Sequence, residues 1–279
     1  MPEQFEVWRM AEYLKDFNLL GQSVQKISFP NLGYRMALPN SVSFLKEHLI
    51  GQPLLAIHTK AKYTFLSFPS GTWVWHYRFT GIPHLRNKKY SHRLYSIFSL
   101  PISEPNAKYC RLTIKFDSEI LDYIDTRCLS KLSFYPNMTF ESTPEYLKTA
   151  DDLFSFEKFD LCLTLSKFKS SNRLLKQWLL DQAQAPSGIG NYLACEILAF
   201  AKLYPFLKVS QLRKKHLLGL QLAIKNVKKQ CLSSAEYNWF TVFKRQNCAN
   251  CGHSIVREKI PVNAQTTHYC PFCQKYKLL

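Results

Sequence analysis

The sequence predicts an α+β protein of several domains, in which an N-terminal helix and a β-sandwich or barrel precede a helical region and a C-terminal finger. Three observations predict this order: a helical stripe at the start, a long series of short β-rich runs, and four cysteines with metal-ligand spacing near the end. A chain of 279 residues with 46% apolar content has room for about two domains and a small module.

The elements follow one another in a clear order along the chain. Apolar residues at helical spacing predict an amphipathic helix over residues 3–17. From about residue 22 to 140, β-rich runs alternate with Pro, Gly, Asn and Ser, which is typical of a β-sandwich or barrel. These runs include Lys62–Phe68, Thr72–Phe79, Arg93–Leu100 and Arg111–Phe116.

Helical spacing returns after about residue 150. The expected helices are Leu174–Leu179, Leu193–Ala201 and a basic segment from Ser210 to about Lys229. We therefore expect three domains, over residues 1–145, 146–240 and 241–279.

The charge of the chain indicates an anionic partner. Lys and Arg total 37 against 20 Asp and Glu, a net charge of +17, which favours nucleic acid or an anionic membrane. The longest apolar stretch, Ile189–Leu207, contains charged residues and cannot cross a bilayer without burying them. Glutamates stand where a leader peptide would carry basic residues. We expect a protein of the cytoplasm or nucleoid, not of a membrane.

Four of the nine cysteines are spaced as metal ligands. Two Cys-x2-Cys pairs flank an 18-residue spacer, which predicts one structural Zn²⁺ held by four thiolates. The predicted ligands are Cys248, Cys251, Cys270 and Cys273. Basic residues such as Arg257 and Lys259 in the spacer favour phosphate contacts, and binding to a protein stays an alternative.

A glycine-rich turn, Ser187–Asn191, lies between two of the expected helices. Its glycines permit close approach of a ligand, and backbone N–H groups at a helix N-terminus attract phosphate. The alternative is an ordinary helix connection in which Asn191 is the N-cap.

The N-terminus carries a possible nucleophile. Removal of Met1 would expose the secondary amine of Pro2, whose reference pKa is near 8, so part of it would be neutral at pH 7. Attack on the anomeric carbon of a sugar gives an iminium ion, which acts as an electron sink and promotes elimination of the adjacent phosphate. Glu3 would act as a general acid towards the ring oxygen, and Glu6 would orient the amine.

Together these motifs resemble the formamidopyrimidine-DNA glycosylase and endonuclease VIII family. The resemblance rests on Met1-Pro2-Glu3, on Gly188–Tyr192 with Glu196 downstream, and on the finger ending at Cys270–Gln274. It spans almost the whole chain and implies a helix-two-turn-helix domain between the β-sandwich and the zinc finger. It also implies a monomer that acts on double-stranded DNA containing a damaged base or an abasic site.

The resemblance also implies roles for individual residues. Pro2 would be the Schiff-base nucleophile and Glu3 the acid, while Lys62 and Asn191 would hold phosphate groups of the DNA. Enzymes of this family flip the damaged nucleotide out of the stack and fill the gap with side chains.

The segment His76–Gly81 resembles the family segment that supplies one gap-filling side chain, which makes Phe79 the candidate and places His76 beside the DNA. A second segment, Asp125–Leu129, resembles the family loop that supplies two more such side chains, which makes Arg127 and Leu129 candidates. We call Phe79, Arg127 and Leu129 the wedge residues. A Phe79 that faces the core of a strand is the alternative.

The chain departs from the family pattern in several places. Gln265 stands where members usually have an arginine that grips the phosphate at the lesion, Phe5 replaces a usual proline, and the second segment keeps one of two arginines. Only 42 residues separate Pro205 from Cys248, which is short for the capping loop of the oxidised-purine enzymes. Oxidised pyrimidines or a broad range of lesions are therefore expected.

The expected function is a bifunctional DNA glycosylase and abasic-site lyase of base-excision repair. The alternatives are a catalytically weakened lesion- or structure-specific DNA-binding protein of the same fold, favoured by Gln265, and a zinc ribbon that binds other proteins. A steep decrease of affinity with salt would distinguish DNA binding from the last of these.

Overall fold

The computed structural model describes residues 2–33, 35–86, 106–184, 186–233, 237–259 and 265–275. It divides into two compact units, residues 1–149 and residues 150–279. The expected run Arg93–Leu100 lies outside the described residues. None of the helices in the described ranges combines the length and apolar character that a bilayer crossing requires.

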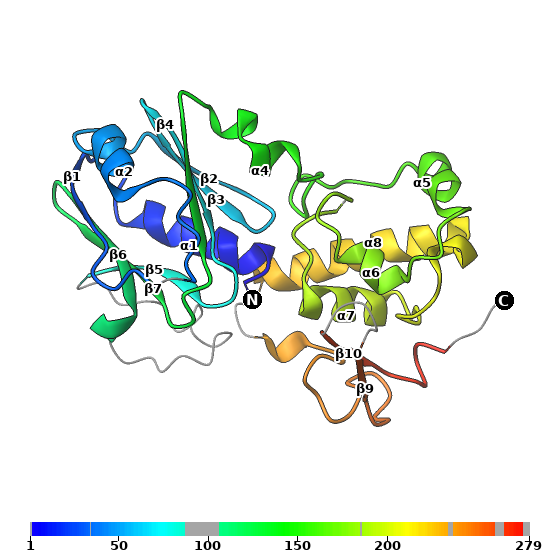
Figure 1. The fold of residues 1–279 in the computed structure, drawn as a ribbon. Coiled ribbons are helices and arrows are strands. Elements are labelled where there is room, and N and C mark those ends of the chain that lie inside the picture. The colour runs from blue at the N-terminus through cyan, green and yellow to red at the C-terminus, as the bar shows by residue number, and fades with distance from the viewer. Residues whose placement is uncertain are drawn as a thin grey trace. The chain divides into compact units, whose positions relative to one another are not determined.

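The first unit begins with helix α1, Gln4–Asp16, as the helical stripe predicted. Its described strands form two four-stranded sheets, in the orders β1-β6-β7-β5 and β2-β3-β4-β8 (Figure 1). The first sheet contains β1 (Val24–Ser28), β5 (Gly81–Leu85), β6 (Cys110–Phe116) and β7 (Ile120–Asp125). The second contains β2 (Ala56–Lys60), β3 (Tyr63–Phe68), β4 (Gly71–His76) and β8 (Lys131–Pro136).

One hydrophobic core joins both sheets to α1. The apolar face of α1 contributes Val7, Met10 and Leu14, all fully buried, and the sheets contribute large side chains such as Trp75 and Phe116. This packing fixes the N-terminal end of α1 against the sheets, because burial of so much apolar surface holds the helix in one position. The unit also contains helices α2 (Val42–Leu49) and α4 (Pro144–Leu147).

The regular elements described in the second unit are helices and one β-hairpin. Its helices are α5 (Leu161–Phe168), α6 (Leu175–Leu179), α7 (Asn191–Phe200) and α8 (Lys214–Ser233). Helices α7 and α8 pack side by side (Figure 1). The hairpin pairs β9 (Val256–Lys259) with β10 (Thr266–Tyr269). Short 3-10 helices occur in both units: at Ala107–Tyr109 and Phe140–Ser142 in the first, and at Val209–Gln211 and Tyr237–Trp239 in the second.

Several boundaries differ from the sequence-based expectations. Helices α2 and α5 were not predicted, because each has only eight residues and presents a short apolar pattern. The third helix of the second unit begins at Lys214, later than the expected Ser210, because a 3-10 turn precedes it. The expected strand Thr72–Phe79 ends at His76, and this places Phe79 in a turn.

Candidate active site and nucleic-acid interface

The start of the chain is buried at the N-terminal end of α1. Pro2 is buried, and Glu3 and Glu6 are 3% and 0% exposed. Glu3 is the N-cap of α1 and forms a reciprocal capping box with Glu6, in which the Glu3 backbone N–H donates to Glu6 Oε2 at 2.6 Å. The capping box satisfies N–H groups that the first helical turn would otherwise leave unpaired, so it fixes the conformation directly after Pro2.

Lys62 comes from the tight turn between β2 and β3 and joins this cluster. Ala61 has a φ of 52°, which turns the chain sharply before Lys62, whose side chain is 7% exposed. Burial lowers the pKa of Lys62, while the carboxylates of Glu3 and Glu6 raise it. The structure thus brings three of the expected catalytic residues together, with a buried ammonium group beside two carboxylates.

His76, at the end of β4, also lies near Lys62. It pairs with Tyr63 across the sheet, and the two ring centroids are 4.8 Å apart. Burial, together with the positive charges of Arg78, Lys62 and Lys131, lowers the pKa of His76 from 6.5 to about 3. His76 is therefore neutral at neutral pH, chiefly because burial disfavours its charged form and also because positive charges lie nearby.

The low pKa of His76 makes stability depend on pH. Because the folded protein resists protonation of His76, its stabilising contribution is complete above pH 6.5 and is lost as the pH falls towards about 3. His76→Phe keeps a ring against Tyr63 but cannot titrate. Between pH 6.5 and 5, wild type should lose about 2 kcal/mol more of its free energy of unfolding than the variant. Urea unfolding at several pH values measures this difference, and parallel curves would contradict it.

The wedge residues lie close together at one end of the first unit. Phe79 stands in the turn between β4 and β5 and is 40% exposed, so the alternative of a core-facing strand residue is wrong. The guanidinium of Arg127, in the loop between β7 and β8, lies 4.7 Å from the centroid of the Phe79 ring. Leu129, in the same loop, is half-buried. Two segments far apart in sequence thus present an exposed aromatic ring and a cation side by side.

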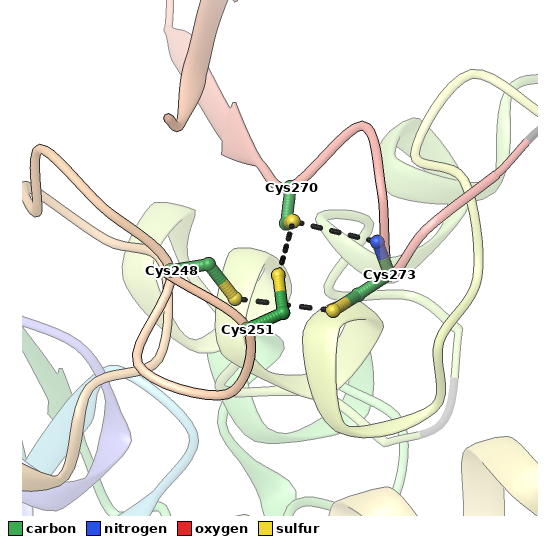
Figure 2. Close-up of side chains that lie close together, drawn as sticks. All are labelled: Cys248, Cys251, Cys270 and Cys273. Carbon is green, nitrogen blue, oxygen red and sulfur yellow. Dashed lines mark hydrogen bonds between the residues drawn. The ribbon is translucent and has the colours of Figure 1, made fainter. Parts of the chain in front are cut away.

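The four predicted metal ligands converge in the second unit (Figure 2). Their Sγ atoms all lie within 4.8 Å of one another, with Cys248 and Cys273 at 4.0 Å and Cys251 and Cys270 at 3.5 Å. A tetrahedral ion with metal–sulfur bonds of about 2.3 Å would separate its sulfurs by about 3.8 Å. The cluster therefore fits one ion with four thiolate ligands and no open position.

The cysteine cluster is packed directly onto helix α7. Cys195 and Ala199 of α7 form a common core with Val242, Cys248 and Cys270. Gln274, fully buried, accepts a hydrogen bond from Cys270 N at 2.9 Å and donates one to Leu203 O at 2.9 Å. The finger is thus anchored to α7 by a shared apolar core and by the hydrogen bonds of Gln274.

Asn191 is held by the finger and by a buried lysine. The Lys176 ammonium, 0% exposed, donates to Asn191 Oδ1 at 2.7 Å and to Thr267 Oγ1 at 2.9 Å. Asn191 Nδ2 in turn donates to Thr266 O at 3.0 Å. Gly190 is the N-cap of α7, and Asn191 is the first residue of the helix.

Gln265 directly precedes β10 and is half-buried. Its Oε1 is buried and accepts no hydrogen bond from the described residues. It is adjacent to Thr266, whose carbonyl accepts a hydrogen bond from Asn191 at the start of α7, so the two expected phosphate-binding residues of the second unit lie beside the start of β10.

Glu196 stabilises the segment that leads into the finger. Its buried carboxylate accepts backbone N–H groups from Thr241 at 2.6 Å, Val242 at 2.9 Å and Phe243 at 2.7 Å. Burial raises the pKa of Glu196, whereas these hydrogen bonds lower it. Such a cup of three N–H groups is suited to a carboxylate, which only accepts hydrogen bonds.

Replacing the Glu196 carboxylate by an amide should destabilise the second unit. Glu196→Gln points an NH2 group at backbone donors, which should cost about 2 kcal/mol in the free energy of unfolding. Thermal or urea denaturation measures the loss, and Glu157→Gln, at an exposed position, is the matched control. Equal stability of the two variants would show that the three N–H groups find other acceptors.

Three residues with evident roles at these sites were not predicted from the sequence. Lys176 gave no signal, because a lysine in a helical pattern normally faces solvent. Asp125, whose carboxylate accepts the backbone N–H groups of Arg127 and Leu129, lies in the segment Asp125–Leu129 but was not predicted to have a role. Thr80, whose hydroxyl donates to Asp125, was not predicted either. An aspartate at the end of a predicted strand, followed by an exposed loop, is the pattern that would have pointed to Asp125.

The chain is similar to formamidopyrimidine-DNA glycosylases over nearly its whole length. The model of the formamidopyrimidine-DNA glycosylase N-terminal domain matches residues 1–132. The formamidopyrimidine-DNA glycosylase of Lactococcus lactis subsp. cremoris is 30% identical over 99% of this chain and 100% of its own length. The protein of the same name from Protochlamydia amoebophila is 28% identical over 99% of this chain and 100% of its own.

Solved structures show the same similarity. The Lactococcus lactis enzyme in complex with DNA containing an oxidised pyrimidine superposes with a TM-score of 0.81 and 25% identity. The match covers 98% of this chain and 100% of that one. The fold of both units therefore has a known counterpart.

Proposed function

Because the chain belongs to the formamidopyrimidine-DNA glycosylase family, we propose that it removes oxidised bases from duplex DNA in base-excision repair and then cleaves the abasic site as a lyase. The observation that carries the proposal is the buried cluster of Pro2, Glu3 and Lys62 at the start of α1. A nucleophile, an acid and a phosphate-binding cation are the groups that this chemistry requires.

In the proposed reaction the amine of Pro2, exposed by removal of Met1, attacks C1′ of the everted nucleotide. The bond from C1′ to the base breaks, and the base leaves with the electron pair and takes up the proton that the amine loses. Protonated Glu3 then donates a proton to the ring oxygen as the sugar opens to the iminium ion. Loss of a proton from C2′ then expels the 3′ phosphate, since the iminium nitrogen accepts the electron pair. Lys62 holds a DNA phosphate nearby, and Glu6 keeps the start of α1 in place through the capping box.

The second unit would bind the phosphates of the DNA backbone. We propose that Cys248, Cys251, Cys270 and Cys273 hold one Zn²⁺, which is structural because sulfur fills every position. Asn191 and Gln265 would contact phosphates beside the lesion, and the hairpin β9–β10 carries basic residues for further contacts. The wedge residues of the first unit would fill the gap left by the everted base.

Borohydride reduction tests the proposal directly. Incubation with duplex DNA containing an abasic site or an oxidised pyrimidine should yield a covalent protein–DNA adduct, because borohydride reduces the iminium ion to a stable amine. Peptide mapping should place the adduct at Pro2. An adduct at a lysine, or none with either DNA, would contradict the assignment.

A second candidate is a lesion-binding protein with weakened catalysis. Gln265 favours it, because a neutral amide there replaces a charge-assisted contact to phosphate worth about 1 to 2 kcal/mol more. Tight, salt-sensitive binding to abasic DNA without an adduct would support this candidate over the enzyme.

A further inference from the structure

The loop between β7 and β8 is organised by one buried carboxylate. Asp125, the last residue of β7, is 0% exposed. Its Oδ2 accepts N–H groups from Leu129 at 2.8 Å and from Ser130 at 2.9 Å, and the Ser130 hydroxyl at 2.8 Å. Its Oδ1 accepts the N–H of Arg127 at 3.2 Å. The backbone on both sides of the two wedge residues in this loop is therefore tied to one side chain.

The same carboxylate also holds the neighbouring turn. The Thr80 hydroxyl donates to Asp125 Oδ1, and the N–H of Arg127 lies 3.1 Å from the same hydroxyl. Thr80 directly follows Phe79, and its neighbour Gly81 pairs with Asp125 across the sheet. Asp125 thus connects the turn that presents Phe79 to the loop that presents Arg127.

The surroundings leave this arrangement little freedom. Cys128 has a φ of 54°, a left-handed conformation that turns the chain between Arg127 and Leu129. A Cβ added at Gly81 would lie 2.1 Å from the Tyr123 hydroxyl and 2.5 Å from Ser130 Oγ. That hydroxyl donates to Ser130 Oγ at 2.8 Å, so the hydrogen-bonded layer beneath the loop is closely packed.

We propose that Asp125 is a positioning residue that locks all three wedge residues in their DNA-inserting conformation before DNA binds. The inference rests on the proposed function, and it adds to the wedge residues a residue that holds them in position, Asp125. Everting a base opens a gap in the stack, and filling it with side chains lowers the cost. A preset wedge fills the gap without first ordering two loops, and this ordering would otherwise oppose eversion.

The substitution Asp125→Asn tests the proposal, because its amide turns a donor towards the N–H groups of the loop. Single-turnover release of an oxidised base from a fully paired duplex should fall by about tenfold to a hundredfold. Release of the same base from a single-nucleotide bulge should stay within about threefold of wild type, because a bulged base is already partly unstacked. A change confined to the paired substrate is not expected from general loss of folding.

Asp122→Asn is the matched control. Asp122 lies in the same strand, is 7% exposed, and pairs with Arg86 at 2.7 Å, away from the loop. It should leave the ratio of the two release rates unchanged. Equal losses on both substrates for Asp125→Asn, or the same ratio in both variants, would overturn the proposal. Where Asp125→Asn does not fold, Thr80→Val removes one of the hydrogen bonds and should show the same selectivity with a smaller effect.

A fluorescence measurement separates this inference from the proposed chemistry. A 2-aminopurine beside a tetrahydrofuran abasic analogue reports insertion of the wedge without any bond breaking. Wild type should change its fluorescence on binding, and Asp125→Asn should reduce the change at equal occupancy. If wild type releases no base yet shows the change and the variant loses it, the positioning role stands and the catalytic proposal fails. A full change with Asp125→Asn overturns the positioning role.

Discussion

Replacing Pro2 by a residue that also keeps Met1 in place is expected to abolish adduct formation and strand cleavage. Pro2→Gln places a large second residue that blocks removal of Met1 and replaces the secondary amine by an amide N–H. An amide nitrogen is not a nucleophile, so the rate of borohydride trapping at a preformed abasic site should fall by about a thousandfold or more. Intact-mass measurement confirms that Met1 is retained, and gel-shift trapping kinetics measure the loss.

Binding must be measured beside chemistry in this experiment. Pro2→Gln should keep most of its affinity for DNA with an uncleavable abasic analogue, because the finger and Asn191 lie in the other unit. Glu12→Gln, on the same helix and paired with Lys15 at the surface, is the control and should trap DNA normally. Trapping by Pro2→Gln at the wild-type rate would show that another amine is the nucleophile.

Loss of the metal should remove DNA binding while the first unit stays folded. Cys270 is fully buried at the junction of the finger and α7, and Cys270→Ser removes one thiolate from the cluster. The metal contributes folding free energy to such a site, of the order of 10 kcal/mol in isolated fingers. Zinc content should fall from one ion per chain to near zero, and affinity for abasic-analogue duplex should drop by about a hundredfold.

The salt dependence of binding provides a second readout for Cys270→Ser. Without a folded finger the protein should neutralise fewer phosphates, so its affinity for DNA should decline less steeply as salt is added. Cys162→Ser changes an exposed cysteine on α5 and should alter neither zinc content nor affinity. A Cys270→Ser protein with the affinity and salt dependence of wild type would contradict a role of the finger in DNA binding.

Much of the fold follows from local patterns in the sequence. The spacing of apolar residues predicts α1, α7 and α8 because a helix repeats every 3.6 residues. The two Cys-x2-Cys pairs predict the metal site because their spacing lets four thiolates surround one ion. Where the pattern was too short, as in α2 and α5, prediction failed. The end of β4 was misplaced because Phe79 continues a run of strand-forming residues but stands in the turn.

The candidate site was predictable only in part. The motifs pointed to Pro2, Glu3 and Lys62, yet nothing local showed that a turn 59 residues away would place Lys62 beside the start of α1. Lys176 could not be found at all, since its partner Thr267 lies 91 residues further along the chain. Long-range contacts of this kind are set by packing of whole elements, which single-sequence periodicity does not contain.

The contacts of Lys176 affect the rate at which the second unit should associate with duplex DNA. One ammonium joins the first turn of α7 to β10, and Gln274 joins the far end of the finger to Leu203. The described part of the finger is therefore hydrogen-bonded to both ends of α7 before any DNA binds. Because this contact is already formed, diffusional encounter and long-range electrostatic attraction should determine the association rate of the second unit with DNA. Its residence time should depend on how many DNA phosphates the unit contacts at once.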